Sequence, residues 1–500
     1  MTLWVDVEDL FHYAHRRSRP SGIQRVAFEL SQALQTRYKG TNLVRFVRYD
    51  PLRNSFWTVD WSEIAGVFNG LTEPESAPKR HVPGDTAPRP AAEQFVRKLV
   101  YRLPGPMHVH ATDALVAQRH ALHAWGRFFG ALARGVTGAP RWFAQRRERG
   151  TTNAEQTDVS DSPALASGAA FATQVAPGDT LLTLGAFWSH PDYAALIEKH
   201  RRRLGLRYAL VVYDIIPLRH PEWCDRGFVR IFRTFFDSVV PLCDTILAIS
   251  EATATDVTDY ARERDIKLSA PVVPIPMGSG FGVASPATLV PRTGQLPPAG
   301  SYVLFVSTIE ARKNHLLLFR VWLRLLEELP PDQVPALVFA GRVGRLVDDL
   351  MQQIANTNYL NGKLMVIESP GDSELVALYQ GCRFTLFPSF HEGWGLPVTE
   401  SLAFGKPCLI ADRTSLPEAG GSLARRFDPD NLHDAYAVIR AVIVDPAGLE
   451  RWAETVRREF NPVPWTESAE ALFEALEGSG TANAGGVHPG VMSTEPANTA

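Results

Sequence analysis

The chain has 500 residues, an apolar fraction of 45% and a formal net charge of −3 at pH 7. This size and composition indicate a globular protein of two or three domains, and a charge so near zero gives no general preference for nucleic acid. The cysteines are scattered along the chain, which is unlike a zinc site or a disulfide framework and typical of a reducing compartment. They are Cys224, Cys243, Cys382 and Cys408.

The N-terminal residues MTLWVDVEDL contain no basic region followed by an apolar stretch, so we expect no secretory signal. No apolar run approaches the length that spans a bilayer. We therefore expect a cytoplasmic protein.

The N-terminal residues predict a strand, a loop and a helix. Residues 3–7 form an apolar run, and apolar residues recur at helical spacing over 23–34. Gly22 precedes that helix, where its backbone would let a phosphate approach the helix N-terminus. A plain helix cap is the alternative interpretation of Gly22. Residues 43–49 predict the next strand.

Residues 65–178 interrupt this pattern and predict an insertion into the first domain. Residues 71–92 are rich in proline and indicate a loop, while residues 150–178 have a composition typical of disorder. Residues 93–149 are helical in pattern and basic. Within 113–134, five apolar residues form one stripe, which predicts either packing on the first domain or contact with an anionic membrane surface. They are Leu115, Leu122, Trp125, Phe129 and Leu132.

Short apolar strands alternate with helices through the rest of the chain, which predicts parallel sheets covered on both faces. In the first half we expect strands at 180–184, 207–213, 245–249 and 272–275, with helices at 192–203, 226–242 and 251–263. Residues 286–300 indicate a linker. In the second half we expect strands at 302–306, 336–340, 364–368, 384–387 and 408–411. Helices are expected at 315–329, within 429–460 and at 466–476.

Residues 389–400, SFHEGWGLPVTE, carry the strongest chemical pattern. They follow an apolar run, pass through a loop with two glycines, and enter a helix at Pro397. The N–H groups and dipole of a helix N-terminus attract anions. Glu392 and Glu400 flank this position, which suits a ligand with both phosphates and hydroxyls. A lone glutamate in a first helical turn would usually be only a capping residue.

This segment resembles the E-x7-E signature of the retaining glycosyltransferases of family 4. Glu392 and Glu400 match the two acids, and residues 393–397 match the segment between them, including Gly393, Gly395 and Leu396. The resemblance implies the α/β GT-B fold, in which two Rossmann-like domains face a cleft. It implies an acceptor-side domain over 1–295 and a nucleotide-sugar-binding domain over 296–478 with a final crossover helix. We expect residues 479–500 to be a disordered tail.

Residues 308–314, TIEARKN, follow the first strand of the second half and are similar to the E-x-R-K-N element of the family. The resemblance implies that Arg312 and Lys313 hold the donor diphosphate, for which guanidinium and ammonium groups are suitable partners. A solvated basic turn is the alternative interpretation. Some members carry another arginine six residues before the lysine, where this chain has Ser307, so one phosphate contact is in doubt.

Three further positions complete the predicted site. Gly341 lies in a turn that looks like the one lining the nucleotide base in the family. Asp214 ends a strand of the first half and is a candidate for acceptor or sugar-hydroxyl contacts, with a strand-end turn as the alternative. Related enzymes often have a histidine before this aspartate, where this chain has Tyr213.

These motifs predict a retaining glycosyltransferase that builds surface polysaccharide, with GDP-mannose as the first choice of donor and a glycan or lipid-linked acceptor. Arg312, Lys313 and Gly22 would stabilise the departing diphosphate. Glu400 would bind the ribose, and Glu392 the donor sugar. No Asp-x-Asp cluster sits at a strand end, so we expect no metal, and no other cofactor. The alternatives are an epimerase or phosphorylase on the same fold, or a non-catalytic nucleotide-sugar-binding module.

Overall fold

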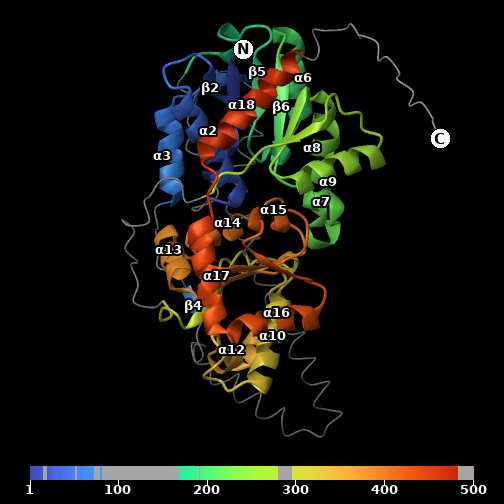
Figure 1. Cartoon of the computed structure of the whole chain (residues 1–500). Coiled ribbons are helices and arrows are strands. Elements are labelled where there is room, and N and C mark those ends of the chain that lie inside the picture. Colours follow the sequence, from blue (N-terminus) through green and yellow to red (C-terminus); the bar gives the residue numbers. More distant parts are fainter. Residues whose placement is uncertain are drawn as a thin grey trace, which may run out of the picture. The chain divides into compact units, whose positions relative to one another are not determined.

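The computed structural model describes residues 1–14, 20–50, 53–72, 79–81, 168–190, 192–279 and 296–481. Within these ranges the strands form two seven-stranded sheets (Figure 1). The first has the order β3-β2-β1-β5-β6-β7-β8, and the second has the order β14-β13-β12-β9-β10-β11-β4. Two predominantly parallel sheets with helices between successive strands are the architecture that the alternating pattern predicts.

The first sheet is parallel except where β2 pairs with β3. Its strands are β1 (Leu3–Asp6), β2 (Val44–Asp50), β3 (Ser55–Thr58), β5 (Thr180–Thr183), β6 (Arg207–Val212), β7 (Thr245–Ala248) and β8 (Val272–Pro274). Its helices are α1 (Glu8–Ala14), α2 (Gly22–Arg37), α3 (Trp61–Thr72), α6 (Tyr193–Leu204), α7 (Ile216–Arg219), α8 (Arg226–Val239) and α9 (Glu251–Glu263).

Strand β6 shows why this sheet is buried on both faces. Ala209 and Val211 contribute to the apolar core on one face, and Leu210 and Val212 contribute to the core on the other. Successive side chains of a strand point to opposite faces, so an apolar run without polar alternation requires cover on both.

The second sheet is parallel except where β11 pairs with β4. Its strands are β4 (Lys79–His81), β9 (Tyr302–Val306), β10 (Ala336–Ala340), β11 (Leu364–Glu368), β12 (Thr385–Phe387), β13 (Cys408–Ala411) and β14 (Arg425–Phe427). Its helices are α10 (His315–Glu328), α11 (Asp348–Asn356), α12 (Asn358–Asn361), α13 (Asp372–Gly381), α14 (Leu396–Ala403), α15 (Leu416–Gly420), α16 (Leu432–Ile443) and α17 (Pro446–Glu459).

The last described helix, α18 (Trp465–Thr481), lies against α2, as Figure 1 shows. Leu472 and Phe473 belong to the core of the first sheet, and the Phe473 ring stacks on Tyr38 with centroids 4.5 Å apart. The chain therefore returns from the second sheet to the first before it leaves the described residues.

Several elements were not anticipated from the sequence. Helices α1 and α3 and strands β3 and β14 fall where no element was expected, and β4 lies within the expected loop over 71–92. The helical region 429–460 is two helices, α16 and α17. The second begins at Pro446 and is capped by Asp445, whose side chain accepts a hydrogen bond from Gly448 N at 2.8 Å. Strands β3, β4 and β14 are only three or four residues long, and such short strands carry little periodicity of their own.

Most of the predicted insertion, including the basic stretch 93–149, lies outside the described residues, as do most of the linker 286–300 and the tail beyond residue 481. The predicted domain limits therefore stay predictions. Among the described helices, none combines the length and the apolar character needed to cross a bilayer.

Candidate active site

Neighbouring strands place the two main sequence motifs together. Strand β12 pairs with β9 in parallel register, with Thr385 opposite Leu304. The motif loop, residues 389–395, follows β12, and residues 308–314 follow β9. Because parallel strands end at the same edge of a sheet, both loops lie at one edge, where open α/β sheets bind ligands.

Glu392 lies between the two predicted cations. Its carboxylate is 2.5 Å from Lys313 Nζ and 2.9 Å from an Arg312 guanidinium nitrogen. Burial alone would raise its pKa, but Arg312 and Lys313 oppose that effect and lower the pKa of Glu392 to about 2. Glu392 is therefore an anion at neutral pH, and it pairs with both of the cations that the sequence assigned to a diphosphate.

The motif loop is held by the segment that begins α15. Ser415 Oγ donates to the carbonyls of Glu392 and Trp394 at 3.0 and 2.8 Å, and Glu392 N donates to Thr414 Oγ1 at 3.1 Å. These hydrogen bonds fix the backbone of Glu392 and thereby orient its side chain. The residues Thr414 and Ser415 are positioning groups that the sequence analysis did not identify as such.

The two glycines of the motif have separate structural reasons. A Cβ on Gly393 would lie 2.0 Å from the carbonyl oxygen of Tyr213, so the backbone of the motif loop meets the end of β6. Gly395 has φ of 112° and directly precedes α14, a conformation that favours glycine. Leu396, the first residue of α14, packs with Trp394 against the core of the first sheet.

Glu400 does not join this group. It is buried in α14 and accepts a hydrogen bond from Tyr379 at 2.8 Å, while Arg25 of α2 lies 3.6 Å from its carboxylate. Arg25 also pairs with Asp372 at 2.9 Å. Burial raises the pKa of Glu400, and Arg25 and Tyr379 partly offset this. The two acids of the signature therefore occupy different electrostatic environments.

Arg25 is a site residue that sequence reasoning missed. It lies three residues after Gly22, and its guanidinium links α2 to acids of α13 and α14. The sequence offered one signal of its role, which is its place in the first turn of a helix. A cation is unfavourable beside the positive end of the helix dipole, so an arginine there indicates that acids lie nearby.

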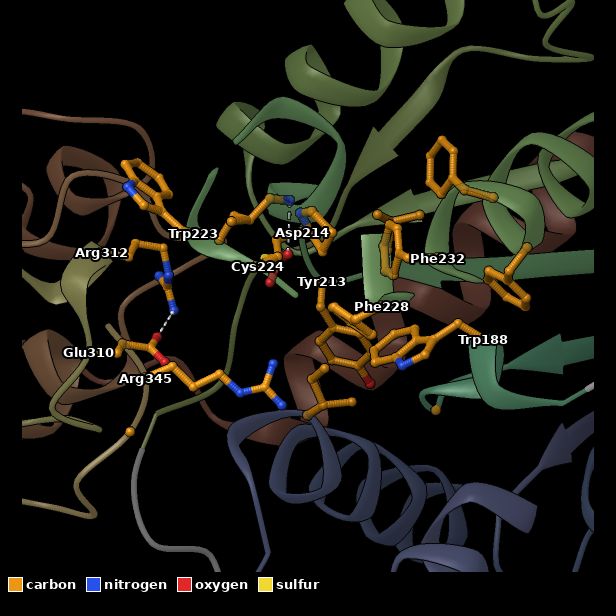
Figure 2. A pocket seen from close by; sticks show the side chains of 18 of the residues that line it. Trp188, Tyr213, Asp214, Trp223, Cys224, Phe228, Phe232, Glu310, Arg312 and Arg345 are labelled. Atoms are coloured by element: carbon orange, nitrogen blue, oxygen red, sulfur yellow. Dashed lines mark hydrogen bonds and ion pairs between the residues drawn. The ribbon is translucent and has the colours of Figure 1, made fainter. Parts of the chain in front are cut away.

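A cavity of about 470 Å³ adjoins the charged edge, a size typical of small-molecule sites. In Figure 2, Glu310, Arg312 and Arg345 lie on one side, Trp188, Phe228 and Phe232 lie on the other, and Asp214 and Cys224 lie between them. Its lining thus comes from both sheets. Of the predicted residues, Arg312 and Asp214 line it, whereas Lys313, Glu392, Glu400 and Gly22 are not part of its lining.

Asp214 is held at the end of β6 by accepting a hydrogen bond from Ile216 N at 3.1 Å. Burial raises its pKa, and the charge of Arg312 opposes this. Tyr213, which stands where relatives often have histidine, donates its hydroxyl to the carbonyl of Leu184 and presents its ring to the cavity. Its hydroxyl is therefore engaged by the backbone, and Asp214 is the acid in the middle of the cavity.

Gly22 and Gly341, two of the predicted glycines, lie outside the lining of the cavity. Gly22 is the first residue of α2, and a Cβ there would meet nothing within 4 Å. Gly341 has φ of 155°, and its Cβ would lie 1.9 Å from Ser307 O, so its close approach to the neighbouring strand end accounts for a glycine. Arg342 and Arg345 of the same turn do line the cavity.

The expectation that no Asp-x-Asp cluster sits at a strand end is wrong. Asp428 and Asp430 come directly after β14, a strand that was not predicted. Arg413 pairs with both of them, at 2.8 and 2.9 Å, so one arginine already contacts both carboxylates of this cluster. Over the described part of the chain, no three His, Cys, Asp or Glu side chains gather as metal ligands would. Metal independence stays a prediction.

Two Rossmann-like sheets with a cavity lined from both, and a charged loop edge on the second, define the GT-B architecture that the sequence predicted. Residues 291–459 match the family model described as "Glycosyl transferases group 1", and this part of the chain belongs to that family. The resemblance to family 4 glycosyltransferases is thereby confirmed, and this region is a glycosyltransferase domain.

Curated relatives include bacterial mannosyltransferases. The chain is 28% identical over 295 residues to the serotype-specific mannosyltransferase WbdA of Escherichia coli, covering 57% of this chain and 35% of that protein. It is 27% identical over 256 residues to the O-antigen chain mannosyltransferase B of Escherichia coli, covering 50% and 63%. It is 28% identical over 253 residues to the D-inositol 3-phosphate glycosyltransferase of Thermobifida fusca, covering 48% and 56%. The chain thus spans about a third of the length of WbdA.

Among solved structures, Anabaena HepE in complex with UDP covers 96% of this chain and 100% of its own. The two are 12% identical with a TM-score of 0.49. Because this score is below 0.5, the assignment of the architecture depends on the two sheets described above.

Proposed function

We propose that this protein transfers a sugar, with retention of anomeric configuration, from a nucleotide-sugar donor to the hydroxyl of an acceptor. The observation that carries the proposal is the placement of Arg312, Lys313 and Glu392 at the edge of the second sheet, beside a cavity that also contains Asp214. The family match over 291–459 supports the same reaction class.

The reaction would place its developing charges against these groups. The bond between the anomeric carbon and the diphosphate breaks, and the leaving group gains negative charge. Arg312 and Lys313 would stabilise that charge in a partly desolvated site, where such contacts are strongest. Glu392 would contact donor-sugar hydroxyls and stabilise positive charge at the anomeric carbon. Glu400 would bind the ribose, and the backbone at Gly22 would contact the phosphate.

The acceptor hydroxyl forms the new bond to the anomeric carbon. Asp214 is proposed to contact this hydroxyl or those of the donor sugar, since it lies between the charged and the aromatic sides of the cavity. The turn at Gly341 is proposed to lie near the base, with Arg342 and Arg345 at the cavity wall.

GDP-mannose is the proposed donor. The proposed acceptor is a glycan of a surface polysaccharide or its lipid-linked precursor. The support is the similarity to WbdA and to the O-antigen chain mannosyltransferase B, both at 27–28% identity over part of their length. A melting-temperature screen of nucleotide sugars tests this choice. A shift with UDP-sugars and none with GDP-mannose would refute the donor.

Slow hydrolysis of the donor without acceptor, followed by transfer once an acceptor is supplied, is the decisive test of the reaction class. Proton NMR of the product would give its anomeric configuration, which should match the donor's. Formation of an epimeric nucleotide sugar, or of a sugar phosphate when phosphate is added, would indicate the epimerase or phosphorylase alternative. Donor binding without any turnover would indicate a non-catalytic module.

A cytoplasmic location with contact to an anionic membrane remains part of the proposal. The basic stretch 93–149 on which the membrane contact depends lies outside the described residues. Co-sedimentation with anionic liposomes, compared with a chain lacking 93–149, would test it, because interfacial binding that depends on basic residues weakens at high salt. Equal pelleting of both chains would exclude this segment as the membrane contact.

A further inference from the structure

The cavity beside Asp214 has two chemically different ends. One end holds Glu310, Arg312, Arg342 and Arg345, which are charged. The other end, which we call the aromatic arm, is formed by Trp188, Phe228, Phe232, Phe235 and Phe236. The proposed function assigns the charged end to the donor diphosphate and leaves the aromatic arm without a role.

Helix α8 builds most of the aromatic arm. Its N-terminus is fixed by Asp225, whose carboxylate accepts hydrogen bonds from Gly227 N and Phe228 N at 2.8 and 3.2 Å. Phe228 and Phe232 are one helical turn apart and therefore lie on the same face. Their rings pack around Trp188, with centroid distances of 5.9 and 5.2 Å. The arm is thus a packed wall of rings at one side of the cavity, as Figure 2 shows.

The chemistry of this wall favours a hydrocarbon group over the hydroxyls of a sugar. Phenyl rings offer no hydrogen-bond partner to a hydroxyl, so the indole N–H of Trp188 is the one conventional hydrogen-bond donor among the five side chains of the arm. The nearby Tyr213 hydroxyl is already donated to the carbonyl of Leu184. A hydroxyl buried there without partners loses its bonds to water, which costs free energy. A hydrocarbon group gains by leaving water at the same place.

We infer that the aromatic arm binds a hydrocarbon group of the acceptor, close to the hydroxyl that receives the sugar. The inference rests on the proposed function for the identity of that hydroxyl. A cavity of about 470 Å³ contains Asp214, the charged end and the arm together, so the hydrocarbon lies within one small ligand's length of the reacting atoms. Of the two acceptor classes proposed above, this selects the lipid-linked one, a short amphipathic alcohol or glycoside, over the distant end of a long glycan. A reaction that attaches or exposes a hydroxyl next to an apolar chain must supply this substrate.

Matched probes can separate the hydrocarbon from the sugar. Octyl and methyl α-mannoside share one head group, and calorimetric titration below the micelle concentration, with GDP present, measures the affinity of each for the full chain. We expect octyl mannoside to bind about ten-fold more tightly or better, because several methylene groups leave water. Trp188→Ala and Phe228→Ala should remove most of this advantage and leave the methyl mannoside affinity unchanged.

Controls distinguish a binding effect from a folding effect. Ile231→Ala removes an apolar side chain from the exposed face of the same helix, where Ile231 is 47% exposed, and should keep the octyl preference. Phe228→Leu should keep part of it at an unchanged melting temperature. Equal affinities of the two mannosides in the native chain, or an octyl preference that survives both alanine variants, would overturn the inference. Absence of donor turnover with every nucleotide sugar would instead refute the proposed function, and the titration would still report on the arm.

Discussion

The edges of the two sheets that border the cavity carry side chains of different chemistry. The edge of the second sheet is ionic, and its two motif cations are already paired with acids: Arg312 contacts Glu310 and Glu392, and Lys313 contacts Glu392. The edge of the first sheet is mostly aromatic, with Asp214 as the acid between Arg312 and the rings. An ionic edge suits an anionic ligand, which can take the place of the Glu392 carboxylate beside the cations. An aromatic edge suits an apolar group, which gains free energy when it is removed from water.

This contrast separates the two substrates by chemistry. In the proposed reaction, the donor diphosphate competes with Glu392 for Arg312 and Lys313, so the carboxylate would be freed for other contacts only when the donor is bound. The acceptor side requires no such exchange. The expected effects on transfer are therefore largest at the ionic edge and smallest in groups that act only on stability.

Lys313→Ala should nearly abolish transfer and weaken nucleoside diphosphate binding about 10- to 150-fold, because it removes a charge-assisted contact of roughly 1.5–3 kcal/mol. The fold should persist, since Arg312 still pairs with Glu392. Titration calorimetry and kcat/KM would measure both effects, with Lys267→Ala as an exposed lysine control. An unchanged kcat/KM in a folded Lys313→Ala chain would refute the ionic edge as the donor site.

Gly393→Ala should disturb the contact between the two edges. The new Cβ would lie 2.0 Å from Tyr213 O, and both partners are backbone, so we expect a loss of about 1–3 kcal/mol in unfolding free energy together with reduced transfer. Gly22→Ala is the matched control, because its Cβ would meet no atom within 4 Å. Denaturant unfolding of the two variants measures the difference. Equal stability of the two would mean that the loop does not press on β6.

The two acids of the motif should fail in different ways. Glu400→Gln should mainly raise the donor KM, since Glu400 is assigned to the nucleotide, and Glu392→Gln should mainly lower kcat, since Glu392 is assigned to the reacting sugar. Steady-state kinetics with saturating acceptor would resolve the two parameters. The opposite pattern would mean that the roles are exchanged.

Arg25 and Glu400 should be energetically coupled, because the guanidinium of Arg25 in α2 lies 3.6 Å from the carboxylate of Glu400 in α14. A double-mutant cycle with Arg25→Gln and Glu400→Gln, measured as donor binding free energies, should give a coupling of roughly 0.5–3 kcal/mol. The same cycle with Arg37→Gln, whose guanidinium pairs with Glu470 of α18, should give none. Additive effects in the first cycle would remove Arg25 from the site.

Stability should depend on pH in opposite senses at the two edges. Burial raises the pKa of Asp6, at the end of β1, to about 8, so its contribution is present below about pH 4 and is lost as pH rises toward 8. The depressed pKa of Glu392, about 2, makes a contribution that is present above about pH 4.5 and is lost as pH falls toward 2. Asp6→Asn should therefore flatten the decline in unfolding free energy between pH 4 and 8 and leave transfer almost unchanged. A decline as steep as in the native chain would exclude Asp6 as its cause.

Much of the fold was predictable because each half repeats one local pattern. The apolar runs at 302–306 and 336–340 and the helix at 251–263 lie where the sequence placed them, since a buried parallel strand and an amphipathic helix each carry their own signal. Strands β3 and β14 were missed because they are short and lie at the ends of their sheets. Missing β14 also concealed the Asp428 and Asp430 pair that follows it.

Sequence alone determined which residues of the second sheet meet. The strand ends before Arg312 and before Glu392 had to reach one edge of a parallel sheet, so their association follows from local periodicity and topology. The tertiary structure decided the partners that come from far along the chain. Arg25 pairs with Glu400, and the backbone of Gly393 lies against the carbonyl of Tyr213. The rings of Phe228 and Phe232 in α8 lie on the opposite side of the cavity from Arg312. Such contacts depend on how the helices and loops of one sheet meet those of the other, and a contact between two distant segments leaves no periodic pattern in either of them.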